Sequence, residues 1–191
     1  MRARVVCLHV TTATSQGEGI HTARLQLMTD FLTLVKRDHH DLECELETLL
    51  HAQTASQLRT ALDGVRLGLT AHAEAEDIVL AIAMRHMTHR DQLESLIGEA
   101  RQAHLAQEGA LASLVCEPPG TDRWRQRARH LLELVRDHAS FEEDRVIPAI
   151  AELAPEIYPR LAGQFATERL RQLAMLQPSA PIYVPELALA G

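Results

Sequence analysis

The sequence predicts an all-α protein, an up-down-up-down four-helix bundle with an additional C-terminal helix and an extended tail. Aromatic residues make up only 3% of the 191 residues, and the abundant Ala, Leu, Glu, Arg and Gln favour helix over strand. Apolar residues also recur at alternating steps of three and four along four segments, which is the period of a bundle seam. With 46% hydrophobic residues, the chain can build the core of one domain.

The first predicted helix begins at Thr22, within a bundle that we expect to span residues 21–153. Residues 1–20 mix Thr, Ser, Gln and Gly without a helical period, so we expect a flexible N-terminal tail. The inward positions of the first helix are Met28, Leu32, Val35, His39, Leu42, Leu46 and Leu49. This pattern turns His39 toward the core and its neighbour His40 away from it.

The second predicted helix begins near Thr54 or Ser56, which are both favourable N-cap residues. Its inward positions are Leu58, Leu62, Val65, Leu69, His72, Glu76, Val79 and Ala83. His72 and Glu76 are four residues apart and therefore share one helix face. A buried carboxylate costs on the order of several kcal/mol unless it is paired, so Glu76 needs a metal ion, an arginine or a protonated histidine as partner.

The third and fourth predicted helices carry a second copy of this pattern. The third follows a break at residues 87–89, and its inward positions are Leu93, Ile97, Ala100, His104, Gln107, Leu111 and Leu114. Residues 118–120, Pro-Pro-Gly, end it, and Thr121 or Asp122 can cap the fourth helix. The inward positions of the fourth include Leu131, Val135, His138, Glu142 and Val146, and the helix should end before Ala154.

The C-terminal part of the chain predicts one more helix, over residues 154–177, and then an extended tail over residues 178–191. The apolar positions of this helix are Ile157, Leu161, Phe165, Leu170, Leu173 and Leu176. We expect this face to cover either the bundle end or a second subunit. The tail is rich in proline, and it is expected to be disordered, with a partner-binding or bundle-bound strand as the alternative.

The four inward histidines are spaced so that a bundle brings them to one level. His72 follows His39 by 33 residues, and His138 follows His104 by 34. The predicted turns fall about midway between successive histidines, so each helix returns the next histidine to the same height. One inward histidine is an ordinary core residue, but four at one level with two carboxylates do not fit an apolar core.

This arrangement predicts a two-metal site. Imidazole and carboxylate ligands suit iron, manganese or zinc, whereas calcium and magnesium prefer oxygen ligands. If each metal takes two histidines and both glutamates bridge, each metal still accepts an oxo or hydroxo bridge and an exogenous ligand. The predicted metal ligands are His39, His72, Glu76, His104, His138 and Glu142. The other histidines, at 9, 21, 40, 51, 86, 89 and 130, lie in tails, near turns or off the seams, and we expect them to face solvent.

At these residues the sequence resembles the hemerythrin-like, or HHE cation-binding, family. The family motifs H…HxxxE…H…HxxxE correspond to Asp38-His39, His72–Glu76, His104 and His138–Glu143, followed by Val146-Ile-Pro148. The resemblance covers about residues 22–152. It implies a four-helix bundle whose cofactor is a pair of non-haem iron ions, held by the six predicted ligands, with manganese or zinc as alternatives.

One position departs from the oxygen-carrying members of that family. They have a second histidine four residues after the first on the third helix, where this chain has Glu108. The resemblance therefore implies a peroxide- or nitric-oxide-reactive protein, or an iron or oxygen sensor, rather than a simple oxygen carrier. Glu43 likewise follows His39 by four residues. Three roles are open to it: a further metal ligand, an acceptor for an imidazole N–H, or a solvated surface residue, which we favour.

Charge and cysteine content exclude several classes of function. The net charge of −7 gives no basic surface for nucleic acid, and no apolar stretch reaches 18 residues, so we expect neither nucleic-acid nor membrane binding. Cysteines at 7, 44 and 116 form no CxxC pair, and their odd number fits a reducing compartment, so we expect a cytoplasmic protein.

The expected function is that of a di-iron protein, with an oxo or hydroxo bridge, that binds or reduces dioxygen, peroxide or nitric oxide. No separate catalytic residue is apparent; if the protein is an enzyme, we expect a peroxide- or nitric-oxide-reactive oxidoreductase. The alternative is a metal- or oxygen-responsive regulatory module, and a zinc storage bundle is a weaker one. Homo-oligomer formation or a protein partner would use the C-terminal helix and tail.

Overall fold

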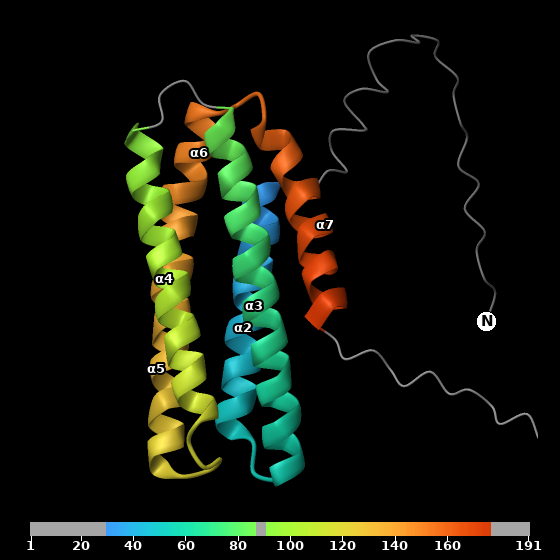
Figure 1. Ribbon diagram of the computed structural model, residues 1–191, viewed down its shortest axis with the longest axis vertical. Helices are drawn as coiled ribbons and strands as arrows, with labels where there is room; N and C mark the ends of the chain where they lie inside the picture. The colour runs from blue at the N-terminus through green and yellow to red at the C-terminus, as the bar shows by residue number, and fades with distance from the viewer. Residues whose placement is uncertain (1–29, 87–90, 177–191) are drawn as a thin grey trace, which may run out of the picture.

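Helices form the regular structure in a computed structural model of the chain, which describes residues 30–86 and 91–176 (Figure 1). The elements are α2 (Phe31–His51), α3 (Ala55–Arg85), α4 (Asp91–Val115), α5 (Asp122–Phe141), the π-helix η1 (Glu142–Val146), α6 (Ile147–Leu153) and α7 (Tyr158–Leu176). The predicted all-α helical bundle is confirmed. In the described residues, no helix is both long and apolar enough to cross a membrane.

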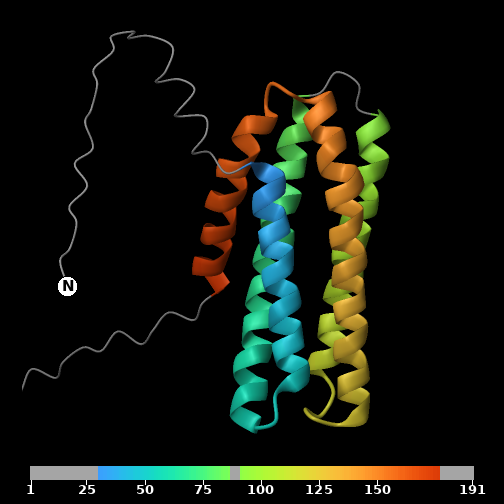
Figure 2. The same cartoon turned by 180° about the vertical axis from the view of Figure 1, so that it is seen from behind.

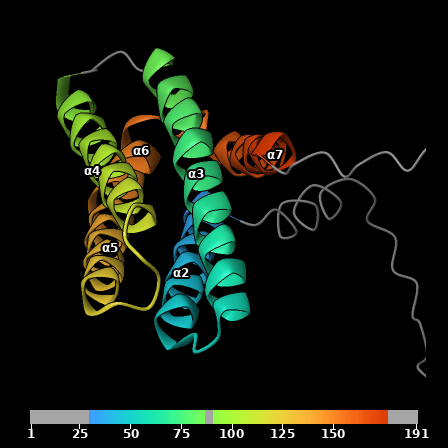
Figure 3. The same cartoon turned by 60° about the horizontal axis from the view of Figure 1, so that its bottom comes forward.

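Four antiparallel columns make up the bundle. Figure 2 shows α2 descending, α3 rising, α4 descending, and α5, η1 and α6 rising together as one column. The last helix, α7, packs along α3 and α2 on the side away from α4 and α5 (Figure 3). The short α2–α3 and α4–α5 connections force neighbouring helices to run in opposite directions.

Two threonines that the sequence predicts as N-caps, Thr54 and Thr121, cap α3 and α5. Thr54 caps α3 in a capping box: its side chain accepts a hydrogen bond from Gln57 N, and the Gln57 side chain accepts one from Thr54 N. Thr121 Oγ1 accepts a hydrogen bond from Trp124 N at the start of α5. Gly120 precedes it with φ +81°, a conformation that glycine adopts without strain. Thr54 and Thr121 are therefore the caps among the predicted candidates.

Several expectations lie outside the described residues. They concern the flexible tail over residues 1–20, the first turns from Thr22 to residue 29, the break at residues 87–89 and the tail over residues 178–191. In the structure the first helix is described from Phe31 onward, and α7 ends at Leu176.

The fourth column is not a uniform α-helix. A π-helical turn over Glu142–Val146 separates α5 from α6, where the sequence predicts one continuous helix. Pro148 lies two residues after this turn, and proline has no N–H to donate to the carbonyl four residues earlier, which favours a wider turn at this place. The column ends at Leu153, before Ala154, as predicted.

The bundle core has two apolar clusters with a polar layer between them. One cluster contains Val35, Val79, Ile97 and Ile150, and the other contains Leu42, Leu69, Leu114 and Val135. The layer consists of the buried His39, His72, Glu76, His104, His138 and Glu142, and we call it the histidine–glutamate layer. The predicted inward positions that the structure describes are thus buried, except Leu32, Leu58 and Leu62, which are half-buried.

The apolar face of α7 covers the bundle of its own chain. Leu161 and Phe165 are buried in the same cluster as Val35 and Val79. Leu170, predicted on this face, is 67% exposed instead. The reason is that Arg169 and Gln172 occupy the inner side of the helix at this height, where they meet polar groups of α2 and of α7 itself.

Candidate metal centre

The histidine–glutamate layer brings together side chains from all four columns. It draws His39 from α2, His72 and Glu76 from α3, His104 from α4, and His138 and Glu142 from the α5–η1 column. Both glutamates and His72 are 0% exposed, and His104 is the most exposed of the six at 7%. The six residues that the sequence predicts as ligands therefore lie together in the middle of the bundle.

Glu76 lies between two imidazole nitrogens. Its Oε2 is 3.1 Å from His72 Nε2 and 3.6 Å from His104 Nε2. Ligand atoms bound to one ion at metal–ligand distances near 2.1 Å lie about 3.0–3.4 Å apart. Both distances from the Glu76 carboxylate are thus close to the distance between two ligands of one metal ion.

Glu142 forms a matching arrangement on the other side of the layer. Its Oε2 is 3.4 Å from His39 Nε2 and 3.3 Å from His138 Nε2. The two halves meet where His104 Nε2 lies 3.0 Å from His138 Nε2. We refer to Glu76 with its two histidines, and Glu142 with its two, as the two half-sites.

His104 is placed a little apart from the rest of the layer. Potential ligand atoms of the other five residues all lie within 4.8 Å of one another, and His104 is not in that set. It still reaches Glu76 and His138, at 3.6 Å and 3.0 Å. His104 therefore forms the outer edge of its half-site.

Many polar atoms of the layer have no hydrogen-bond partner within the described protein. These atoms are His39 Nε2, His72 Nε2, His138 Nδ1 and both carboxylate oxygens of Glu76 and Glu142. Buried polar atoms are rarely left unpaired, because each one loses its hydrogen bonds to water without replacement. Metal ions would satisfy the imidazole Nε2 and carboxylate atoms, so the residues present fit a metal centre.

Three acids outside the predicted set orient the histidines. Asp38 Oδ2 accepts a hydrogen bond from His72 Nδ1 at 2.9 Å, and Glu143 Oε1 accepts one from His39 Nδ1 at 3.0 Å. Asp77 Oδ1 does the same for His104 Nδ1 at 3.2 Å. A proton held on Nδ1 leaves the Nε2 lone pair free to face the half-site, which is how metal-binding histidines are usually held.

Sequence reasoning did not assign a role to these acids, although a signal was present. Each one directly adjoins a predicted ligand: Asp38 precedes His39, Asp77 follows Glu76 and Glu143 follows Glu142. Adjacent residues on a helix point about 100° apart, so an acid beside one ligand faces a histidine of the next helix. His138 has no such acid, since its Nδ1 has no partner in the described residues.

Residues 30–150 match the family model described as the hemerythrin HHE cation binding domain. The chain belongs to this family. The match contains all six residues of the histidine–glutamate layer and the three orienting acids, so the family resemblance inferred from the motifs is confirmed. A metal-binding function for this HHE domain follows from the family and from the buried ligand cluster together.

A curated relative of this HHE protein is a DNA nickase from Nostoc sp. (strain PCC 7120 / SAG 25.82 / UTEX 2576), 23% identical over 159 residues. The alignment covers 83% of this chain and 42% of the relative, so the chain spans less than half the length of that protein. No solved structure matches the chain significantly.

Burial and nearby charges shift the pKa values of the histidines in the HHE centre in different directions. Burial disfavours a charged imidazole; it lowers the pKa of His138 to about 2 and also lowers the pKa of His39. At His72 burial acts in the same direction, but the Asp38 and Glu76 carboxylates outweigh it and raise the pKa to about 9. In the metal-free protein, both imidazoles of the Glu142 half-site, His39 and His138, are therefore held neutral, whereas His72 in the Glu76 half-site is held cationic at neutral pH.

The two glutamates are shifted in opposite directions. Burial alone would raise the pKa of Glu76, but its contacts with His104 and His72 hold that pKa well below its usual range. Burial, reinforced by the nearby charge of Glu76, raises the pKa of Glu142 well above its usual range. The metal-free centre thus holds protons where cations would bind, so metal binding must release protons.

Glu108 and Glu43 do not reach the HHE centre. Glu108 is exposed on α4, because one residue earlier Gln107 takes the inward position. Glu43 Oε2 accepts a hydrogen bond from Arg136 Nε at 2.9 Å on the bundle surface. A direct influence of Glu108 on the metals, which its sequence position suggested, is therefore not supported by its orientation.

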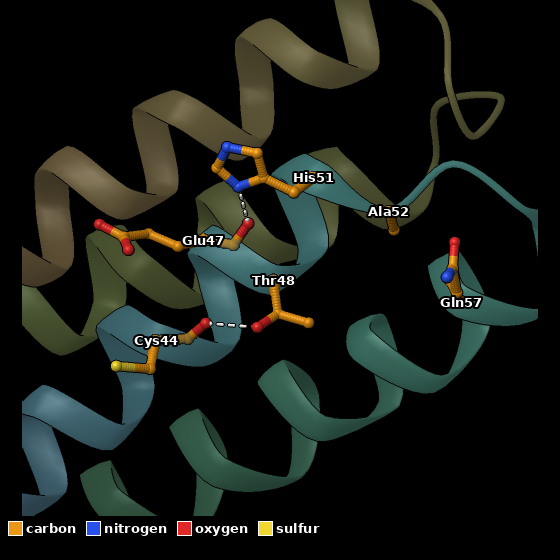
Figure 4. A pocket seen from close by; sticks show the side chains of 6 residues that line it. All are labelled: Cys44, Glu47, Thr48, His51, Ala52 and Gln57. Atoms are coloured by element: carbon orange, nitrogen blue, oxygen red, sulfur yellow. Dashed lines mark hydrogen bonds between the residues drawn. The ribbon is translucent and has the colours of Figure 1, made fainter.

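The histidines that the sequence assigns to solvent are exposed wherever they are described, at positions 40, 51, 86 and 130. His51 illustrates their roles in Figure 4, in a surface hollow beside the α2–α3 turn. Its Nδ1 donates to Glu47 O at 2.7 Å, and the Thr48 hydroxyl nearby donates to Cys44 O at 2.8 Å. These groups bond to the carbonyls of their own helix and form no second metal cluster.

Proposed function

We propose that this HHE protein is a cytoplasmic, non-haem di-iron protein that binds or reduces a small oxidant: dioxygen, peroxide or nitric oxide. The observation that carries the proposal is the pair of half-sites, each with two imidazole nitrogens and a carboxylate in a buried layer. Their symmetry favours two ions over one. His72 and His104 with Glu76 would hold the first ion, and the other three layer residues would hold the second.

Iron suits the donor set and the proposed task. Imidazole and carboxylate donors also accept manganese and zinc, but zinc has no redox chemistry. Two divalent ions against two carboxylates leave a charge of about +2, and a bridging oxide or hydroxide lowers it to a level that a buried site tolerates. Two iron ions that change between ferrous and ferric supply the two electrons that reduction of peroxide to water requires.

The chain contributes orientation and shielding to this chemistry. Asp38, Asp77 and Glu143 hold three imidazoles with Nε2 toward the half-sites. The two apolar clusters above and below the layer exclude water from it. Each half-site has three protein ligands at most before any bridging, so at least one iron keeps a position for an exogenous ligand.

Metal analysis and a visible spectrum of the protein purified without added metal test the proposal. We expect about two iron ions per chain and charge-transfer absorption that changes when azide, peroxide or nitric oxide is added. Stoichiometric zinc with no response to these ligands would refute the di-iron function. Catalytic turnover of peroxide or nitric oxide would make the protein an oxidoreductase.

A regulatory role is the second candidate, and it is favoured by the contact between α7 and the metal centre. Phe165 packs edge-on against the His72 ring with the centroids 6.0 Å apart. Leu170 and Met175 of α7 are 67% and 65% exposed, and a protein partner or second copy would cover such apolar side chains. Metal-dependent protection of α7 from protease, without oxidant turnover, would support this role over the first.

We propose no nucleic-acid or membrane partner for this chain. The net charge of −7 opposes binding to phosphate backbones, and the shared region covers only part of the nickase relative. A gel-shift experiment with DNA at low salt tests whether the chain binds nucleic acid. DNA that migrates more slowly with the protein, and is released by added salt, would contradict the proposal.

A further inference from the structure

A cavity between α3 and α4 reaches the HHE centre at His104. Its volume is about 360 Å³, and its walls include Ala73 and Asp77 from α3 and His104 and Gln107 from α4. His104 is the most exposed residue of the layer and the outer edge of its half-site. A small molecule in this cavity would therefore meet one of the proposed metal ligands directly.

Gln107 lines this cavity and carries an unpaired buried acceptor. Its side chain lies one turn from His104 on the inward face of α4 and is 1% exposed. Its Nε2 donates a weak hydrogen bond to Leu134 O at 3.4 Å, while Oε1 is buried without a partner in the described residues. One N–H of the amide donates to Leu134 O, and the carbonyl oxygen is the buried group that lacks a hydrogen-bond donor.

The charges around the cavity disfavour anions. Glu74, Asp77 and Glu108 line it, and Arg101 is the cation among its lining residues. Arg101 Nε lies 3.6 Å from Asp77 Oδ1, so its charge is already matched by one carboxylate. The remaining carboxylates leave a negative potential at the mouth, which lowers the local concentration of anionic ligands relative to neutral ones.

We propose that the inner end of this cavity, beside His104, is the binding site for the exogenous ligand, and that Gln107 selects hydrogen peroxide there by accepting its O–H. Hydrogen peroxide is small and neutral and carries a donor hydrogen. Dioxygen and nitric oxide have no hydrogen to donate, and azide is an anion without one. The inference rests on the proposed di-iron function, and it narrows the choice of oxidant from dioxygen, peroxide or nitric oxide to hydrogen peroxide.

The route is tested by filling the cavity. Ala73→Phe places a ring in it, and Ala81→Phe is the matched control, because Ala81 is also half-buried on α3 and lines a different hollow toward α4. In iron-loaded protein, Ala73→Phe should slow azide binding and reaction with hydrogen peroxide about ten-fold or more, and Ala81→Phe should leave both within about two-fold. Unchanged rates in Ala73→Phe with full iron content would overturn the route.

The selection by Gln107 is tested by removing its carbonyl. Gln107→Leu, and Gln107→Met as a variant of similar length, should slow the reaction with hydrogen peroxide about five-fold and leave azide affinity within about two-fold, as loss of one hydrogen bond predicts. Equal effects on both probes, or none, would overturn the selection. Wild-type protein without iron would refute the di-iron function instead, so the two failures are distinguishable.

Discussion

Arg169 of α7 forms an ion pair with Asp38 of α2, with Nε 2.5 Å from Oδ1. The other oxygen of Asp38 accepts the Nδ1 proton of His72 at 2.9 Å. Burial would raise the pKa of Asp38, but His72 and Arg169 outweigh it and lower that pKa. Two consecutive polar contacts therefore connect α7 to the metal centre, and α7 acts as part of its wall.

Arg169→Gln should destabilise the protein by about 1–3 kcal/mol, because Asp38 is only 6% exposed and would lose a charged partner. Arg171→Gln is the control on the same helix. Arg171 pairs with Glu168 at the surface, where such pairs contribute about 0–1 kcal/mol. Urea denaturation of the metal-loaded proteins measures both changes. Equal losses in the two variants would mean that the Arg169 contact is an ordinary surface pair.

Replacement of a layer histidine should empty the centre, because each half-site has only two imidazoles. We expect His72→Ala and His138→Ala to lower the iron content sharply, measured by elemental analysis after purification. His40→Ala and His130→Ala should keep it, since both side chains are exposed. A loss of iron in His40→Ala as large as in His72→Ala would contradict the assignment of the inward face of α2.

The orienting acids should act on metal affinity through their histidines. Asp77→Asn weakens the acceptor that holds His104 Nδ1, and we expect about 10–100-fold weaker metal binding, as is typical when such acceptors are changed. Glu108→Gln removes a carboxylate from the same cavity wall without touching a histidine of the layer, and should have little effect. Competition with a chelator of known affinity measures both. Similar losses would indicate a general charge effect instead of orientation.

Removal of metal should destabilise the protein and make its stability depend on pH. The pKa of His72 in the folded apo protein is about 9, against 6.5 as the ordinary value, so this proton stabilises the fold fully below about pH 6.5. The contribution is lost as pH rises toward 9, at no more than about 1.4 kcal/mol per pH unit for one proton. The raised pKa values of His104 and Glu142 act in the same direction.

Metal-loaded protein should lack this slope, because an ion replaces the proton at His72 Nε2. Urea denaturation of apo and holo protein at several pH values between 6.5 and 9 measures the difference. Holo protein should be more stable throughout, with the gap widening as pH rises. Parallel curves for the two forms would show that the layer does not exchange protons for metal.

Local pattern was enough to predict the helices and the inward histidines. The steps of three and four place His39, His72, His104 and His138 on core-facing stripes, and the nearly equal spacings bring them to one level. Helical geometry is regular, so the face of each residue and its height follow from residue number alone. The same regularity predicted that the layer would contain Glu76 and Glu142.

The contacts between helices were decided only by the tertiary structure. The sequence alone did not reveal that Asp38 pairs with His72 and Arg169, or that Glu108 lies exposed beside the cavity. Leu170 turned outward for the same kind of reason, because Arg169 meets Asp38 on the inner side of α7. Periodicity specifies which face of a helix is buried, whereas the partner of a polar side chain depends on the rotation and spacing of the neighbouring helix.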